Sequence, residues 1–189
     1  MEKISLGKNS MFFPMPMGLV GINTDQKPNF TTVGSIAIAS LEPPMVSMSL
    51  NKARFASKFI KEKKMFSLNF PSVNLEGKTD YCGLVSGEKV DKSKIFEVFY
   101  GSLKEAPMIK ECPLCMECQL VAVVDLPKNE LFIGEIVDSY SEEKYLTNGK
   151  PDTSKLKFFT LHFADVSYRS TGGKIGKAFS DGAKIAPLK

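Results

Sequence analysis

The sequence contains no tryptophan and only one histidine, His162, among its 189 residues. A single histidine does not support a Ser/His/Asp or a Cys/His nucleophilic set, and it leaves a histidine-containing zinc site short of ligands. Because His162 stands in the apolar run 158–163, we expect it to occupy a core or interface position. The residue types present therefore give no support to nucleophilic catalysis.

Long apolar segments are also absent. No stretch approaches the roughly 18 apolar residues that a membrane span requires, and residues 1–8 lack the apolar core of a secretion signal. We therefore expect a cytoplasmic protein with no membrane partner. The 25 basic and 21 acidic side chains are interspersed along the chain. The net charge of +4 thus indicates no nucleic-acid partner, and the basic stretch 58–64 has the period of a helix with a solvated lysine face.

Cysteine is scarce, and three of the four cysteines fall in one short motif. Cys112, Cys115 and Cys118 have the spacing of three ligands of an iron–sulfur cluster. The fourth ligand is missing, because the remaining cysteine, Cys82, lies well upstream. We therefore predict plain thiols and no metal, and we keep a redox-active thiol pair as a second interpretation. Without a secretion signal, disulfides are not expected.

The pattern of apolar residues predicts a mainly β protein. Alternating or continuous apolar runs indicate strands at 15–22, 31–39, 45–50, 65–70, 116–124, 131–137 and 156–163. Turn-forming residues at 23–29 and 125–130 close two hairpins. This order favours an antiparallel barrel over a parallel sheet. The length is that of one domain, 1–189, in which we expect 170–189 to form a C-terminal arm.

One clear helix follows the third of these strands. Apolar residues at helical spacing predict that it begins after Asn51, which we expect as its N-cap, and that it ends near Lys63. Shorter helices are expected near 79–84, 91–99 and 140–146. No Gly-x-Gly-x-x-Gly motif follows a strand, so the sequence does not indicate a Rossmann nucleotide site.

The segment 29–40 has almost no side-chain bulk in its middle. Gly34 and Ser35 permit a flat ring to approach the backbone closely. The alternative interpretation is close packing of a neighbouring strand. For Asn29, at the start of the segment, a role in the turn and a role in ligand binding are equally favoured.

The segment 43–51 follows directly and leads to a helix start. Ser47 and Ser49 share one strand face, and Lys52 and Arg54 open the helix. Hydroxyl groups, backbone N–H groups and a cation beside a helix start suit a phosphate. A cation in the first turn is mildly unfavourable to the helix dipole, which favours a ligand role for Arg54 over simple exposure. With the preceding segment, this predicts a nucleotide-like ligand, FMN in the first place.

Several pieces of the chain, in order, match one family. They are the segments 14–17, 27–32, 43–50, 66–71, 80–87 and 131–136. In their order and spacing the chain resembles the flavin reductase-like proteins and, within them, the flavoredoxin branch. The resemblance covers most of 14–168. It implies a six-stranded antiparallel Greek-key split barrel with a few flanking helices, a homodimer, and one FMN per subunit near the subunit interface.

The resemblance also implies roles for parts of this chain. The backbone of 31–35 would line the isoalloxazine, 49–54 would hold the phosphate and ribityl chain, and 82–86 would lie close to the cofactor. The complete set of predicted cofactor-binding residues is Asn29, Thr31, Thr32, Val33, Gly34, Ser35, Ser47, Ser49, Leu50, Asn51, Lys52, Arg54, Cys82, Gly83 and Ser86.

Two functions within the flavin class remain open, and one outside it. In the first, a flavoredoxin-like carrier holds FMN tightly and passes electrons to a redox partner protein. In the second, an oxidoreductase takes hydride from NAD(P)H and reduces an exchangeable flavin or another small acceptor. The lack of a separate nicotinamide-binding motif favours the carrier. The alternative from another class is a cofactor-free binding module on the same barrel.

Overall fold

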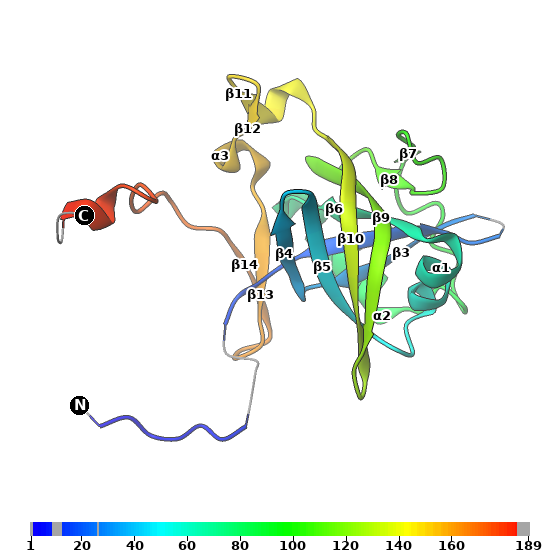
Figure 1. Cartoon of the computed structure of the whole chain (residues 1–189), viewed down its shortest axis with the longest axis horizontal. Helices are drawn as coiled ribbons and strands as arrows, with labels where there is room; N and C mark the ends of the chain where they lie inside the picture. Colours follow the sequence, from blue (N-terminus) through cyan, green and yellow to red (C-terminus); the bar gives the residue numbers. More distant parts are fainter. Residues whose placement is uncertain (1, 9–12, 26, 185–189) are drawn as a thin grey trace.

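One seven-stranded antiparallel sheet dominates the computed structural model, which describes residues 2–8, 13–25 and 27–184 (Figure 1). The order across the sheet is β3-β2-β6-β9-β10-β5-β4. These strands are β2 (Gly18–Asn23), β3 (Pro28–Val33), β4 (Ile36–Leu41), β5 (Pro44–Asn51), β6 (Met65–Phe70), β9 (Leu114–Asp125) and β10 (Asn129–Tyr140). The predicted antiparallel, mainly β architecture is confirmed.

Short strands and helices surround this sheet. A three-stranded sheet holds β1 (Met15–Pro16), β13 (Phe159–His162) and β14 (Ser167–Ser170), and two hairpins join β7 (Val98–Phe99) to β8 (Met108–Ile109) and β11 (Leu146–Thr147) to β12 (Lys150–Pro151). The helices are α1 (Phe55–Lys63), α2 (Glu76–Leu84) and α3 (Thr153–Leu156), with 3-10 turns η1 (Val73–Leu75), η2 (Glu143–Tyr145) and η3 (Asp181–Lys184).

Apolar side chains form two separate cores. The larger one joins α1 to the sheet and includes Phe59, Phe66 and Phe132. The second contains Leu19, Phe30 and Cys82, together with residues of the β7–β8 region. The side of the sheet at β2 and β3 is therefore buried on both faces, which explains the continuous apolar runs there.

The predicted strand 31–39 is interrupted at Gly34 and Ser35. Val33 is the last residue of β3 and pairs with Gly18 of β2, whereas Ile36 opens β4 and pairs with Met48 of β5. The two halves thus belong to opposite ends of the sheet, and Gly34 and Ser35 connect β3 at one end to β4 at the other. The main sheet therefore has seven strands, where the resemblance implied a six-stranded barrel, because one apolar run contributes a strand to each end.

The predicted N-cap, Asn51, was wrong. Asn51 still belongs to β5, where it pairs with Asn129 of β10. Its side-chain Oδ1 accepts a hydrogen bond from the backbone N–H of Ala53 at 2.9 Å, and the helix begins later, with Arg54 in the N-cap position. The side chain of Asn51 therefore stabilises the turn between strand and helix.

Three other local predictions are revised. The helix expected near 91–99 does not form: Asp91 Oδ1 accepts from Ser93 N at 2.9 Å and stabilises a turn, and β7 follows. The helix expected near 140–146 is only the 3-10 turn η2, because β10 continues to Tyr140. The last predicted strand begins at Phe159, after α3. The helix expected near 79–84 is confirmed as part of α2, which begins three residues earlier, at Glu76.

Candidate functional site

A small, partly open cavity of about 70 Å³ lies where β3, the start of α1 and the end of α2 meet. We call it the inner cavity. It is lined by Asn29, Thr31, Ala53, Arg54, Phe55, Ala56, Val85, Ser86, Gly87 and Lys92. These residues come from separate parts of the chain, so the cavity exists only in the folded protein.

Hydrogen bonds hold the walls of the inner cavity together. Arg54 Nη1 donates to the carbonyl oxygen of Gly83 at 2.8 Å, which ties the start of α1 to the end of α2. Thr32 Oγ1 donates to the carbonyl oxygen of Thr79, which ties β3 to the same helix. A Cβ atom at Gly83 would lie 3.2 Å from Thr32 Cβ, so glycine allows the helix to pack closely on the strand.

Lys92 is the most unusual residue of this region, because it is a lysine with only 1% of its surface exposed. Its ammonium group donates to the carbonyl oxygens of Cys82 and Val85, both at 3.2 Å. An ammonium group has three donors. Two are used by these carbonyls, which leaves one for a group inside the inner cavity.

Arg54 and Lys92 place two cations beside one another at the inner cavity. Burial lowers the pKa of Lys92; the nearby Cys82 opposes this effect, and the positive charge of Arg54 adds to it. Within the residues that the structure describes, no carboxylate forms an ion pair with either cation. A buried charge without a counterion is unfavourable. An anionic ligand would relieve this cost.

Asn29 supplies a neutral polar group at the same place. It is only 4% exposed and lines the inner cavity. We find no hydrogen bond of its side-chain amide to any of the described residues. A Cβ atom at Gly87 would lie 2.2 Å from Asn29 Nδ2, so the absence of a side chain at Gly87 leaves room for the amide. Among the described residues the one fully enclosed side-chain N or O atom without a hydrogen-bond partner is Glu130 Oε2, so the Asn29 amide is open to water, which a ligand in the cavity would replace.

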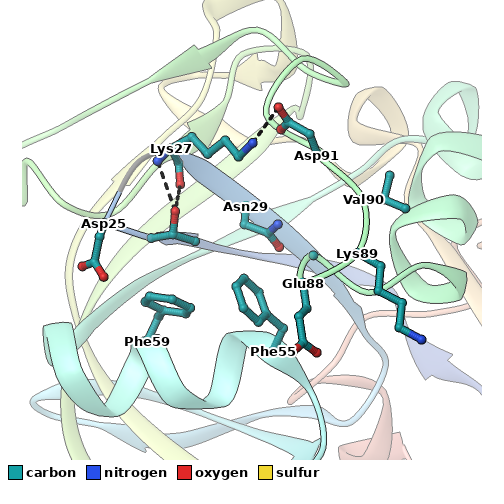
Figure 2. A pocket seen from close by; sticks show the side chains of 11 residues that line it. Asp25, Lys27, Asn29, Phe55, Phe59, Glu88, Lys89, Val90 and Asp91 are labelled. Atoms are coloured by element: carbon teal, nitrogen blue, oxygen red, sulfur yellow. Dashed lines mark hydrogen bonds and ion pairs between the residues drawn. The ribbon is translucent and has the colours of Figure 1, made fainter.

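A larger and more open cleft of about 500 Å³ adjoins the inner cavity (Figure 2). We call it the outer cleft. Asn29, Phe55 and Gly87 line both spaces. Phe55 and Phe59 of α1 form one side of the outer cleft, and the segment 87–91 forms another. The ion pair between Lys27 and Asp91, at 2.8 Å, closes one end.

The structure brings together about half of the predicted cofactor-binding residues. Those around the inner cavity, or bonded directly to its walls, are Asn29, Thr31, Thr32, Arg54, Cys82, Gly83 and Ser86. This grouping joins three parts of the chain, 29–32, Arg54 and 82–86, that sequence spacing alone could not place side by side.

Most of the other predicted residues have side chains that contact other parts of the protein. Val33 and Leu50 are buried in the larger core. Ser49 Oγ accepts from Asn129 Nδ2 at 3.0 Å, Ser47 Oγ donates to Ala37 O at 3.5 Å, and Lys52 forms an ion pair with Asp125. Gly34 and Ser35 lie in the crossing from β3 to β4, where the carbonyl oxygen of Ser35 accepts from Ser49 N at 3.0 Å. Their roles in ligand binding remain predictions.

Six residues that line the inner cavity are not in the predicted set: Ala53, Phe55, Ala56, Val85, Gly87 and Lys92. Of these, Lys92 supplies a charge and Gly87 leaves room for the Asn29 amide. In the sequence Lys92 is one of many scattered lysines, and nothing in its neighbourhood predicts burial. One signal is available for Gly87: the short segment 80–87, which carries part of the family resemblance, contains two glycines.

The cysteines of the 112–118 motif lie away from the inner cavity. Cys112 and Cys115 line a different hollow of about 480 Å³ beside Phe99 and Tyr140. Burial raises the pKa of Cys115 to about 12 and that of Cys112 well above its usual value. Both thiols are therefore protonated at neutral pH, which makes them poor nucleophiles.

His162 sits in β13, and its Nε2 lies 3.0 Å from Thr160 Oγ1. The pair lies on the three-stranded sheet, and neither residue is among those that line the inner cavity. This placement gives the histidine no part in the inner cavity.

The sequence and the architecture match one known family. The sequence model of the flavin reductase like domain matches residues 10–172. The chain belongs to this family. An uncharacterized protein from Archaeoglobus fulgidus is 29% identical over 139 residues, which cover 72% of this chain and 77% of that protein.

Solved structures place this flavin reductase-like chain close to the flavoredoxins. The crystal structure of flavoredoxin from Methanosarcina acetivorans has a TM-score of 0.95 and 46% identity, and covers 98% of this chain and 100% of that one. Flavoredoxin of Desulfovibrio vulgaris has a TM-score of 0.89 and 32% identity, and covers 96% and 100%. The predicted fold class and the predicted flavoredoxin branch are confirmed.

None of the helices in the described part of the chain has the length and apolar character needed to cross a membrane.

Proposed function

We propose that this chain binds FMN, with the phosphate at Arg54 and Lys92, and carries electrons through it as a flavoredoxin-like protein. The observation that carries the proposal is the pair of adjoining cations, one of them buried, without a carboxylate partner among the described residues. The flavoredoxins of similar sequence and structure support the choice of a flavin.

The residues of the inner cavity fit a phosphorylated ligand. Lys92 has one N–H donor to spare, and Arg54 uses one of its five donors on Gly83 O, which leaves others for phosphate oxygens. The amide of Asn29 would donate to or accept from the ribityl hydroxyls or the phosphate. Thr31 lines the same cavity and adds a hydroxyl.

The protein positions its ligand and controls the charge around it. A bound flavin supplies reversible transfer of electrons or hydride. The close packing of α2 on β3, held by Thr32 and Gly83, fixes the wall from which Cys82 O and Val85 O orient the Lys92 ammonium group. Burial raises the pKa of the Cys82 thiol to about 11. This residue is therefore a neutral neighbour of the site.

The visible absorbance spectrum of the purified protein, with and without added FMN, tests the proposal. We expect the bands of oxidised flavin, which survive gel filtration and bleach with dithionite. A spectrum without these bands, even after FMN is added, would contradict flavin binding and leave the cofactor-free binding module.

Oxidation of NAD(P)H then separates the two flavin functions. A carrier holds its FMN through gel filtration and oxidises NAD(P)H slowly unless a partner protein is present. Rapid NAD(P)H oxidation with flavin that is lost on gel filtration would instead identify an oxidoreductase that reduces exchangeable flavin.

A further inference from the structure

Lys92, one of the two cations at the inner cavity, is closed off from solvent, with 1% of its surface exposed. The inner cavity beside it, at about 70 Å³, has room for about two water molecules, since each takes ~30 Å³ in the liquid. A phosphate that carries a ribityl chain therefore cannot reach Lys92 unless part of the wall moves. The part that is held by the fewest contacts is the one expected to move.

One wall is formed by the segment 86–91, which we call the strap. It belongs to the stretch 85–97 between α2 and β7, which contains neither helix nor strand. Ser86 and Gly87 line the inner cavity, and 87–91 line the outer cleft, so the strap borders both spaces (Figure 2). None of the residues 86–91 is buried. The strap thus contributes no side chain to either core.

The strap has few ties to the rest of the protein. Among the described residues, its hydrogen bonds connect positions within 86–93 only, where they stabilise local turns. A single ion pair joins it to a distant part of the chain: Asp91 lies 2.8 Å from the ammonium group of Lys27, in the turn between β2 and β3 (Figure 2). The two side chains are 46% and 42% exposed, and an exposed ion pair is a weak tie.

The two ends of the strap are held more firmly than its middle. Cys82, which precedes it, and Lys92, which follows it directly, are both buried. The Lys92 ammonium group donates to Cys82 O and Val85 O, both at 3.2 Å, and so joins the two ends. The middle of the strap can therefore move away from the inner cavity while both of its ends stay in place.

We propose that the strap opens to admit the phosphate of FMN to the inner cavity, and that the ion pair between Lys27 and Asp91 holds it closed. This inference rests on the proposed function. The outer cleft provides the way in, since it shares lining residues with the inner cavity. The ion pair closes the strap over the empty cavity and over the bound phosphate alike, so it slows both entry and release.

The first test measures the rates of FMN association and dissociation in the full chain by stopped-flow fluorescence. Asp91→Asn and Lys27→Met each remove one charge of the ion pair, and the asparagine keeps an oxygen for Ser93 N. Each variant should raise both rates by roughly two- to fivefold, the effect that one exposed ion pair allows. The dissociation constant should change by less than about twofold, because entry and release are accelerated together. The double variant should match either single variant, whereas independent effects would multiply.

The second test needs no flavin binding. The flavin-free full chain is treated with an amine-acetylating ester, and peptide mass spectrometry measures how fast Lys92 is modified relative to the exposed Lys58 of α1. Asp91→Asn and Lys27→Met should raise the relative rate by the same factor as the FMN rates, because Lys92 reacts only while the strap is open. Circular dichroism checks that each variant is folded, as expected for exposed side chains.

The matched control is Glu97→Gln, which removes a carboxylate from another exposed ion pair, the one with Lys110. It should leave the FMN rates and the modification of Lys92 unchanged. An unchanged modification rate in both ion-pair variants, or an equal rise in the control, would overturn the strap, even in a protein that binds FMN. A rise in modification in a protein that does not bind FMN would instead support an opening strap and contradict the proposed function.

Discussion

At the scale of single residues, the site depends on two cations that donate to backbone carbonyls but have no carboxylate counterion among the described residues. Lys92 and Arg54 bring two positive charges to one cavity, and Asn29 adds an amide. Proteins bury such groups at a cost, so an arrangement of this kind is typical of a binding site. The cavity needs no residue of unusual chemistry, only common ones in an uncommon environment.

We expect Lys92→Met to weaken FMN binding by ~1.5–3 kcal/mol, the value of a hydrogen bond to a charged group. This corresponds to a dissociation constant roughly ten to a hundred times higher. The matched control is Lys94→Met, because Lys94 lies two residues away along the chain and does not line the inner cavity. Quenching of FMN fluorescence on titration measures both. Equal affinities for the two variants would remove Lys92 from the site.

Gly87→Ala is expected to reduce FMN affinity through Asn29. The new Cβ would lie 2.2 Å from Asn29 Nδ2, so the amide must move. Loss of one neutral hydrogen bond predicts a change of about 0.5–1.5 kcal/mol in the binding free energy. The control, Gly77→Ala, has open space around the added atom and lies in α2. We expect it to bind FMN normally and to gain about 0.5–1 kcal/mol of stability. An unchanged affinity of Gly87→Ala would contradict the role given to Asn29.

At the scale of elements, one carboxylate holds the loop between β7 and β8 against the sheet. Glu117 lies on β9 and is completely buried. It accepts hydrogen bonds from Ser102 N at 2.9 Å, Ser102 Oγ at 2.7 Å, Leu103 N at 2.8 Å and Tyr140 Oη at 2.8 Å. Burial raises the pKa of Glu117, but these hydrogen bonds outweigh it and lower the pKa overall.

We expect Glu117→Gln to destabilise the protein by about 2–4 kcal/mol at pH 7, because an amide cannot accept all four bonds. Urea unfolding measures the difference.

The stability that ionised Glu117 contributes is present above the ordinary glutamate pKa of about 4.5 and is lost as the pH falls through the lowered pKa of the folded state. The two proteins should therefore become equally stable in acid. Glu97→Gln, which removes only an exposed ion pair with Lys110, should change stability by less than about 1 kcal/mol. A similar loss for both variants would argue against the buried anchor.

At the scale of the whole molecule, two cores divide the thiols between them. Cys118 belongs to the larger core, and Cys82, Cys112 and Cys115 belong to the second. All four are buried and free. Their shared property is burial away from water, which disfavours the thiolate. The cysteines therefore contribute to stability as small apolar residues.

The protein should lose stability at alkaline pH, because the buried thiols resist ionisation in the folded state. Thiols of the unfolded chain ionise near pH 9, whereas burial raises the pKa of Cys82 to about 11 and those of Cys115 and Cys118 to about 12. Ionisation of these thiols then favours the unfolded chain. The stability that the neutral, buried thiols contribute is therefore present below pH 9 and is lost as the pH rises. Each thiol contributes a slope of up to about 1.4 kcal/mol per pH unit. Urea unfolding between about pH 8 and 10.5 should show a flatter slope for Cys118→Ala than for the natural protein. Parallel curves would contradict buried, neutral thiols.

Local sequence patterns determined much of the fold. The turn at 23–29, the strand at 65–70 and the helix that ends at Lys63 follow from residues within a few positions of one another. The prediction of a phosphate near Arg54 is local in the same way, because it rests on the short segment 43–54. Periodicity and turn chemistry act locally, so they can be interpreted without knowing what packs where.

Only the tertiary structure decided which residues meet at the site. The Lys92 ammonium group donates hydrogen bonds to Cys82 O and Val85 O. Arg54 donates to the carbonyl oxygen of Gly83, 29 positions away along the chain. The single apolar run 31–39 divides between strands at the two ends of one sheet. Burial of a charge or the crossing of a strand depends on partners that lie far away along the chain. Local sequence carries no record of those partners, because it is the closing of the barrel that brings them together.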